Sequence, residues 1–404
     1  MQARVTVRVE RDAELALVIA HNPPVNTITA EVRAGLRAAL EEIRVMPDVA
    51  GVVLLCEGST FFSGADIAEF SGPPREEEYR ALFNSYENLT IPVVAAMHGT
   101  VLGGGLEMAL ACHYRVASPA SRFGMPEVTL GIIPGAGGTQ RMPRLIGAHK
   151  ALDLILAARP IDTAQASALG FIDEVIAGEL RAGAASYARR LVAAGAGPRR
   201  TSERGVDPST ATPAIFDAMM QRARELYPNR TAGLVAIAAV RAAASLPFQA
   251  GLEYETQLVN ECKQSDESKG AVHAFFAERE TRRIPGLSTE SSSTEVKAAG
   301  IVGAGTMGAG IAICFADAGT PVTLLDANPQ AVQRGIANIE RTYQSMVDRG
   351  RISAHDKQQR LGLIRGSVEY DDLSEADVIV EAVFEDMALK RSIFATLDRV
   401  AKRG

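Results

Sequence analysis

The sequence is poor in cysteine and contains neither a long apolar run nor an excess of basic residues. Its four cysteines among 404 residues are scattered, without a CxxC pair or a paired histidine spacing: Cys56, Cys112, Cys262 and Cys314. This pattern predicts reduced, mostly buried thiols, neither disulfides nor a metal site. No apolar run reaches the roughly 18 residues that a membrane span needs. The formal charge of −6 argues against a nucleic-acid-binding surface.

The remaining composition is that of an ordinary globular protein, with 47% hydrophobic and 22% charged residues. At 404 residues the chain should form two or three domains. Residues 1–7 contain no apolar signal segment and predict a first strand, so we expect a cytoplasmic location. An excess of arginine over lysine and abundant alanine indicate a bacterium of high genomic GC content.

The first half of the chain alternates short strands with helices. Apolar alternation and buried runs predict strands, and apolar residues at helical spacing predict helices. The predicted strands are 5–10, 15–20, 51–56, 92–97 and 115–117, and the predicted helices are 29–45 and 106–112. This strand–strand–helix rhythm indicates stacked ββα turns rather than a doubly wound sheet.

Composition changes after residue 195. Residues 195–213 are poor in apolar side chains and predict a mobile loop or a linker. Helical periodicity follows over 213–227, 231–246 and 247–283, each beginning at a proline or threonine. Residues 285–294, which include a run of serines, predict the clearest domain boundary.

Three loops of small residues in the first half point to one pocket. They are Ser63–Ile67, Leu102–Glu107 and Pro126–Arg141. Small residues let backbone N–H groups approach a ligand carbonyl, and two such groups can stabilise the negative charge that develops on it. Glu107 lies in an otherwise apolar segment, where partial burial would raise its pKa and suit it to proton transfer.

Structural explanations stand beside these functional ones. Glu107 in the first turn of a helix is also explained as a partner of the helix dipole. Glu127, which follows a proline, fits an N-cap or surface role about as well, and the glycines could form tight turns only. The six histidines are isolated along the chain, and each is expected to have a structural or surface role: His21, His98, His113, His149, His273 and His355.

The glycine-rich stretch 301–308 has a different character. An apolar run precedes Gly303, Gly305 and Gly308, a helical pattern follows them, and Asp326 ends the next apolar run. Glycines in such a turn let the backbone approach a pyrophosphate at a helix N-terminus. An acid about 20 residues later accepts a hydrogen bond from a ribose hydroxyl. In this strand–turn–helix–strand context the motif is a strong dinucleotide signal.

Residues 5–190 resemble the enoyl-CoA hydratase (crotonase) superfamily, whose fold is a spiral of ββα turns. The resemblance implies that the N–H groups of Ala65 and Gly104 form an oxyanion hole for a thioester carbonyl. It also implies that Glu107 and Glu127 are the two catalytic glutamates of a hydratase, and that Asp66 and Ile67 contact coenzyme A.

The C-terminal part resembles the NAD-binding domain of L-3-hydroxyacyl-CoA dehydrogenases. Gly303, Gly305, Met307, Gly308 and Asp326 match the cofactor loop and ribose acid. Glu385 and Lys390 match a second segment that meets the NAD cofactor. Residues 261–279 resemble the helix that packs over the hydratase pocket in type-1 multifunctional β-oxidation enzymes.

The resemblance therefore implies an α/β chain in four parts. These are a crotonase domain (1–195), a helical linker packing on it (196–285), a flexible linker (286–294) and a partial Rossmann NAD-binding domain (295–404). The implied reaction is hydration of 2-trans-enoyl-CoA to L-3-hydroxyacyl-CoA, with Δ3,Δ2-enoyl-CoA isomerase as a side activity. Acyl-CoA substrates are expected, and a thiolase subunit as partner, the acyl chain length and the oligomeric state are left open.

Dehydrogenase activity is a separate expectation. The family's catalytic histidine and C-terminal helical domain would lie beyond residue 404, so we expect NAD-dependent dehydrogenation only if the natural chain continues. Two alternatives stay open: a crotonase relative acting on another CoA ester, and a non-catalytic NAD- or acyl-CoA-binding module.

Overall fold

The computed structural model describes residues 6–281 and 295–402, and the chain divides into two compact units, Met1–Ile284 and Pro285–Gly404. The helical residues predicted as a linker therefore belong to the same unit as the predicted hydratase domain. The predicted flexible linker, 286–294, lies outside the described residues. No described helix is long and apolar enough to cross a membrane.

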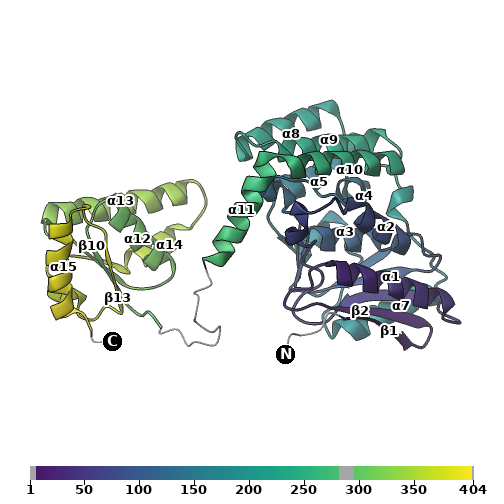
Figure 1. Cartoon of the computed structure of the whole chain (residues 1–404), viewed down its shortest axis with the longest axis horizontal. Coiled ribbons are helices and arrows are strands. Elements are labelled where there is room, and N and C mark those ends of the chain that lie inside the picture. The colour runs from purple at the N-terminus through teal and green to yellow at the C-terminus, as the bar shows by residue number, and fades with distance from the viewer. Residues whose placement is uncertain (1–5, 282–294, 403–404) are drawn as a thin grey trace. The chain divides into compact units, whose positions relative to one another are not determined.

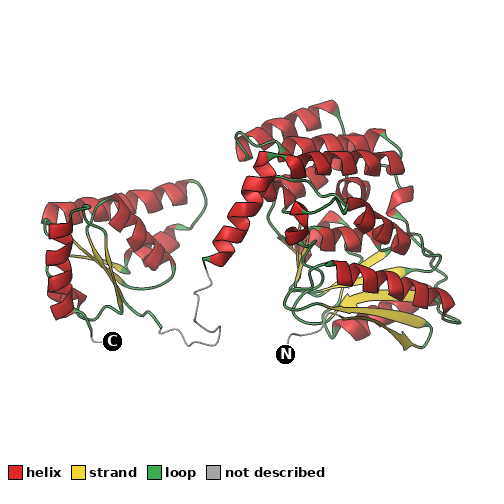
Figure 2. Cartoon of the chain, viewed as in Figure 1, coloured by secondary structure: helices red, strands yellow, loops and turns green. Residues whose placement is uncertain are grey.

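The first unit is built on a six-stranded sheet, and Figures 1 and 2 show its strands with helices packed around them. Its strands, in spatial order, are β1 (Thr6–Asp12), β2 (Leu15–His21), β3 (Gly51–Cys56), β4 (Val93–Met97), β6 (Tyr114–Ala117) and β9 (Glu174–Val175). β1 and β2 form an antiparallel hairpin, and the other neighbours are parallel. β2, β3 and β4 are almost wholly buried, as expected for strands covered on both faces.

A second, three-stranded sheet contains β5 (Thr100–Leu102), β7 (Arg122–Gly124) and β8 (Ile161–Asp162). β4 and β5 lie in different sheets and are followed by a helix, and β6 and β7 repeat that arrangement. The expected ββα spiral is thereby confirmed.

Helices cover both faces of the larger sheet. The helices up to residue 193 are α1 (Ala30–Val45), α2 (Glu76–Glu87), α3 (Gly104–Ala111), α4 (Gly138–Ile146), α5 (Ala148–Ala157), α6 (Thr163–Leu169) and α7 (Leu180–Ala193). Of these, α1 and α7 pack most extensively against the larger sheet. Short 3-10 helices are η1 (Ile67–Ser71), η2 (Glu127–Leu130), η3 (Thr201–Glu203) and η4 (Pro208–Thr210). α7 packs on one face with a small apolar cluster, and the main core fills the other.

Four further helices complete the first unit: α8 (Pro213–Leu226), α9 (Ala232–Ser245), α10 (Phe248–Gln264) and α11 (Asp266–Glu280). α9 and α10 pack against α4, and the three helices lie close together in Figure 1. The prediction of one continuous helical segment over 247–283 is wrong, because the chain turns at Ser265 and forms two helices, α10 and α11. The Ser265 side chain accepts a hydrogen bond from the Ser268 N–H and caps α11.

The loop or linker expected over 195–213 is fixed to the first unit. Thr201 is buried, and the Ser202 N–H donates to Glu87 Oε1 at 2.8 Å. Arg200 donates to the Glu87 carbonyl at 3.1 Å. The low apolar content of 195–213 suggested a mobile loop or a linker, but its polar groups donate hydrogen bonds to Glu87 of the same unit.

The second unit contains a four-stranded parallel sheet in the order β12 (Ile364–Ser367), β11 (Val322–Leu325), β10 (Ala299–Val302) and β13 (Val378–Glu381). Its helices are α12 (Thr306–Asp317), α13 (Pro329–Asp348), α14 (Ala354–Leu361) and α15 (Met387–Val400), with η5 at Tyr370–Leu373. This sequence of neighbours is half of a Rossmann sheet, as expected.

Candidate active site

A cavity of about 680 Å³ lies in the first unit, between η1, α3, η2 and the loop before α4. Side chains from α10 and α11 complete its wall. All six residues predicted for the hydratase site line it: Ala65, Asp66, Ile67, Gly104, Glu107 and Glu127. The fold thus brings three separated loops together at one hollow.

Glu107 is buried near the start of α3 and points to another helix. Its Oε1 accepts hydrogen bonds from the N–H groups of Ala136, at 2.8 Å, and Gly138, at 2.7 Å. These are amides at the N-terminus of α4, so Glu107 is not merely a partner of its own helix dipole. Burial raises the pKa of Glu107, while the two donors and the nearby Arg141 act in the opposite direction. Because both donors use Oε1, the second oxygen is left for a substrate.

Glu127 has a different environment. It is the first residue of η2 and only 9% exposed, which argues against a surface role. Its Oε2 is buried and has no protein partner. Burial, followed by the neighbouring charge of Glu107, raises the pKa of Glu127 well above that of an ordinary glutamate. Glu127 is therefore suited to carry a proton at neutral pH, whereas Glu107 has the donors that stabilise a carboxylate.

Two backbone amides are available in the same cavity. Gly104 opens α3, and a Cβ at this position would lie 3.2 Å from the Ala65 nitrogen. In residues 6–281 and 295–402, no protein acceptor takes the N–H of either residue. Two unpaired amides this close can donate together to one carbonyl oxygen.

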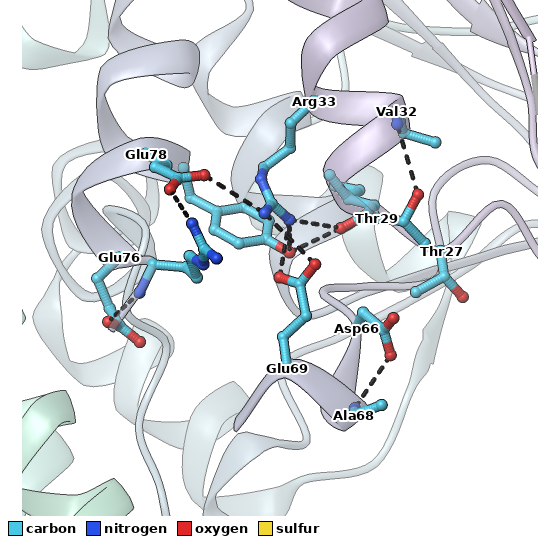
Figure 3. A network of polar contacts seen from close by, with 12 residues as sticks. Thr27, Thr29, Val32, Arg33, Asp66, Ala68, Glu69, Glu76 and Glu78 are labelled. Carbon is cyan, nitrogen blue, oxygen red and sulfur yellow. Dashed lines mark hydrogen bonds and ion pairs between the residues drawn. The ribbon is translucent and has the colours of Figure 1, made fainter. Parts of the chain in front are cut away.

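The loop that carries Ala65 and Asp66 is held by a buried arginine (Figure 3). The Arg33 guanidinium pairs with Glu69 of η1 at 2.9 Å and donates to the Tyr79 hydroxyl of α2 at 2.8 Å. It also lies over the Tyr79 ring, 4.4 Å from the ring centre. The Asp66 side chain accepts from the Ala68 N–H at 3.0 Å and caps η1. These contacts tie η1 to α1 and α2, and so fix the rim of the cavity.

Another buried glutamate, Glu255 of α10, was missed in the sequence. It is fully buried and accepts hydrogen bonds from the amides of Gly137 and Thr139. The signal for it lies in the helix periodicity. Glu255 occupies the stripe formed by the buried residues Leu252, Leu258 and Val259, where an apolar side chain is expected.

The glycine turn of the second unit fits a dinucleotide. A Cβ at Gly308 would lie 1.8 Å from the Gly303 carbonyl oxygen, so the turn closes only with glycine there. At Gly305 a Cβ would meet nothing within 4 Å, and no side chain caps the N-terminus of α12. This leaves open space and free amides where a pyrophosphate would bind. The Asp326 side chain points to the same turn, and its Oδ2 accepts a hydrogen bond from the Ala304 N–H at 3.0 Å.

The second predicted cofactor segment lies beside this turn. Glu381, the last residue of β13, pairs in register with Val302 at the end of β10. Lys390 forms ion pairs with Glu381 at 2.9 Å and Glu385 at 3.1 Å. Met307, in the first turn of α12, is 71% exposed. The predicted cofactor residues thus gather at the carboxyl edge of the sheet, where Rossmann domains bind ligands.

Comparison with known proteins gives two matching families. Residues 10–197 match the family described as enoyl-CoA hydratase/isomerase, and residues 298–404 match the NAD binding domain of 3-hydroxyacyl-CoA dehydrogenase. The match to the NAD-binding domain supports the NAD cofactor expected from the glycine turn.

Curated relatives match nearly the whole chain. A peroxisomal bifunctional enzyme of Danio rerio is 36% identical over 392 residues, which are 96% of this chain and 54% of the relative. A peroxisomal fatty acid beta-oxidation multifunctional protein of Arabidopsis thaliana is 33% identical over 402 residues, covering 95% of this chain and 55% of the relative. The chain therefore spans about half the length of these relatives.

Among solved structures, an enoyl-CoA hydratase from Mycobacterium avium subsp. paratuberculosis K-10 is similar in fold. It is 22% identical, with a TM-score of 0.50, and the match covers 70% of this chain and 98% of that one.

Proposed function

Because residues 10–197 belong to the enoyl-CoA hydratase/isomerase family and residues 298–404 to that of the 3-hydroxyacyl-CoA dehydrogenase NAD-binding domain, we propose that this chain hydrates 2-trans-enoyl-CoA to L-3-hydroxyacyl-CoA. The single observation that carries this proposal is the pair Glu107 and Glu127. The two carboxyl groups line one cavity, and burial raises the pKa of both, that of Glu127 well above its ordinary value. Glu107 accepts two amide hydrogen bonds that stabilise its carboxylate, whereas Glu127 Oε2 has no protein partner.

In the proposed reaction Glu107 acts as the base and Glu127 as the acid. Glu107 removes a proton from a water molecule whose oxygen forms a bond to C3 of the substrate, and the C2–C3 double bond opens. Glu127 delivers its proton to C2. Negative charge that develops on the thioester oxygen is stabilised by the amides of Ala65 and Gly104. Proton exchange between the glutamates and solvent then restores the starting state.

Hydration of crotonyl-CoA by the purified chain tests this proposal, with identification of 3-hydroxybutyryl-CoA as the product. Conversion of a different CoA ester in place of crotonyl-CoA would favour another crotonase reaction. Binding of acyl-CoA without turnover of any ester would favour a non-catalytic module.

The second unit would hold NAD through the glycine turn at 303–308, the acid Asp326 and the segment with Glu385 and Lys390. When bound, NAD supplies a hydride acceptor for the carbon that carries the 3-hydroxyl group. Dehydrogenation itself is proposed for the complete protein, because the chain spans about half the length of its curated relatives.

Asp326 is expected to select NAD over NADP. Its carboxylate would face the 2′-phosphate of NADP, and residues 327–330 supply no arginine or lysine to receive that group. Calorimetric titration with both nucleotides should give tighter binding of NAD, and Asp326→Asn should narrow the difference. Equal affinity of the unaltered protein for NADP and NAD would contradict this assignment.

A cytoplasmic location is likewise proposed from the sequence alone. The names of the curated relatives place those eukaryotic proteins in peroxisomes. Fractionation of the source cells would distinguish the two compartments.

A further inference from the structure

The mechanism above leaves Glu255 unused, although it is the most deeply buried acid near the cavity. It lies on α10 and does not line the cavity itself. Its exposed fraction is 0%, against 3% for Glu107 and 9% for Glu127. A buried carboxyl group is unfavourable unless its surroundings compensate for the lost water, so its contacts identify its role.

Four successive amides at the start of α4 alternate between two glutamates. Ala136 and Gly138 donate to Glu107 Oε1, at 2.8 and 2.7 Å. Gly137 donates to Glu255 Oε1 at 2.6 Å, and Thr139 donates to Glu255 Oε2 at 3.0 Å. Glu107 and Glu255 therefore hold the same segment, Ala136–Thr139, from α3 and from α10. No side chain caps α4 in the usual way, so these two carboxylates satisfy its N-terminal donors.

The Thr139 hydroxyl adds a third donor to Glu255. Gln140 Nε2 donates to Thr139 Oγ1 at 3.0 Å and to the Ala239 carbonyl at 3.0 Å. The hydroxyl proton of Thr139 is then directed to Glu255 Oε2. Both oxygens of Glu255 thus act as acceptors, and a side chain with its own amide hydrogens cannot replace them without losing a bond.

We propose that Glu255 is a positioning residue for the hydratase reaction, which fixes the segment Ala136–Thr139 so that its other two amides hold Glu107. This proposal rests on the proposed function. Helix α10 would then affect catalysis without contacting the substrate. A displacement of Glu255 would move the segment Ala136–Thr139, and with it the amides that hold Glu107.

Charged groups on several elements face Glu255. Burial and the charge of Glu107 on α3 raise the pKa of Glu255, whereas its donors and Arg141 on α4 act in the opposite direction and favour the carboxylate. Glu255 in turn raises the pKa of Glu127 on η2. Arg141 is itself paired with the buried Glu87 of α2 at 2.7 Å. Arg80 of α2 donates to the hydroxyl of Thr256, the residue after Glu255 on α10.

The test replaces Glu255 with glutamine and uses Glu253→Gln, an exposed position on the same helix, as the matched control. Displacement of the amides that hold Glu107 should lower kcat for crotonyl-CoA hydration by about 10²-fold, while KM changes by less than about threefold. Hydrogen exchange of the amides at 136–139 should become faster in Glu255→Gln only. The control should leave both readouts unchanged.

Two further readouts separate positioning from a general loss of structure. In a Glu107→Gln background, Glu255→Gln should lower kcat by less than about threefold more, because both changes act through Glu107. In Glu255→Gln the acidic limb of the plot of kcat against pH should move to higher pH. Glu107 then loses donors that stabilise its carboxylate, which raises its pKa. A limb that moves to lower pH would show that Glu255 acts by its charge alone and would overturn the proposal, as would fully multiplicative losses.

The outcomes stay distinct from failure of the proposed function. If the unaltered protein hydrates no enoyl-CoA, the proposed function fails, while the hydrogen exchange of residues 136–139 still reports whether Glu255 holds that segment. If Glu255→Gln does not fold, Glu255→Asp retains the charge and withdraws the oxygens by one methylene. Normal exchange and normal kcat in Glu255→Asp would then overturn the proposal.

Discussion

Replacing Glu127 with glutamine is expected to slow crotonyl-CoA hydration by about 10²–10⁴-fold, with little change in KM. Glutamine retains the size of the side chain and removes the proton that C2 must receive. The unpartnered, buried Oε2 and the raised pKa both favour the protonated form of Glu127. In the unaltered enzyme kcat should therefore fall as pH rises through this raised pKa, since the acid is then lost.

Glu107→Gln should cause a loss of the same order for a different reason. The glutamine carbonyl can still accept from the amides of Ala136 and Gly138, so the loop keeps its position while the base is removed. Glu42→Gln, at an exposed position of α1, is the matched control and should leave kcat unchanged. Stopped-flow or steady-state hydration rates of all four proteins decide the matter. A Glu127→Gln rate within about threefold of the unaltered enzyme would exclude the two-glutamate mechanism.

Gly104→Ala should lower kcat by about 10²–10³-fold, as much as the loss of one oxyanion-hole donor, because the added methyl group obstructs the two amides although the N–H itself remains. The new methyl group would lie 3.2 Å from the Ala65 nitrogen, where we propose that the thioester oxygen binds between the two amides. The loss should appear mainly in kcat, because charge on that oxygen increases in the transition state.

Gly178→Ala provides the control for this change, since a Cβ there would meet nothing within 4 Å. It should hydrate crotonyl-CoA at the unaltered rate. Full activity of Gly104→Ala, measured under the same conditions, would mean that the thioester carbonyl binds elsewhere in the cavity.

The sequence predicted those parts of the site that lie in short, continuous motifs. The turn from Gly303 to Gly308, followed by Asp326, has local spacing that only a strand, a turn and a helix satisfy. The loops with Ala65, Gly104, Glu107 and Glu127 were likewise identified as lining one pocket. What their side chains contact depends on tertiary packing. Only the structure shows that Glu107 binds the N-terminal amides of α4 and is not simply a partner of its own helix dipole.

Glu255 could not be found in the same way. It contacts Gly137, a residue 118 positions away, and no motif links the two. The break between α10 and α11 at Ser265 was missed for a related reason, because helical periodicity continues across it. The serine cap was visible in the sequence, but apolar spacing outweighed it.

We propose above that residues 1–404 hydrate enoyl-CoA in the first unit and bind NAD in the second. One experiment tests it: purified residues 1–404 are supplied with crotonyl-CoA and NAD, while loss of the conjugated thioester and formation of NADH are recorded together. Conversion to 3-hydroxybutyryl-CoA with no NADH is the expected result, because occupancy of a nucleotide site does not by itself give turnover. Absence of hydration, or NADH formed at a rate comparable to hydration, would contradict it.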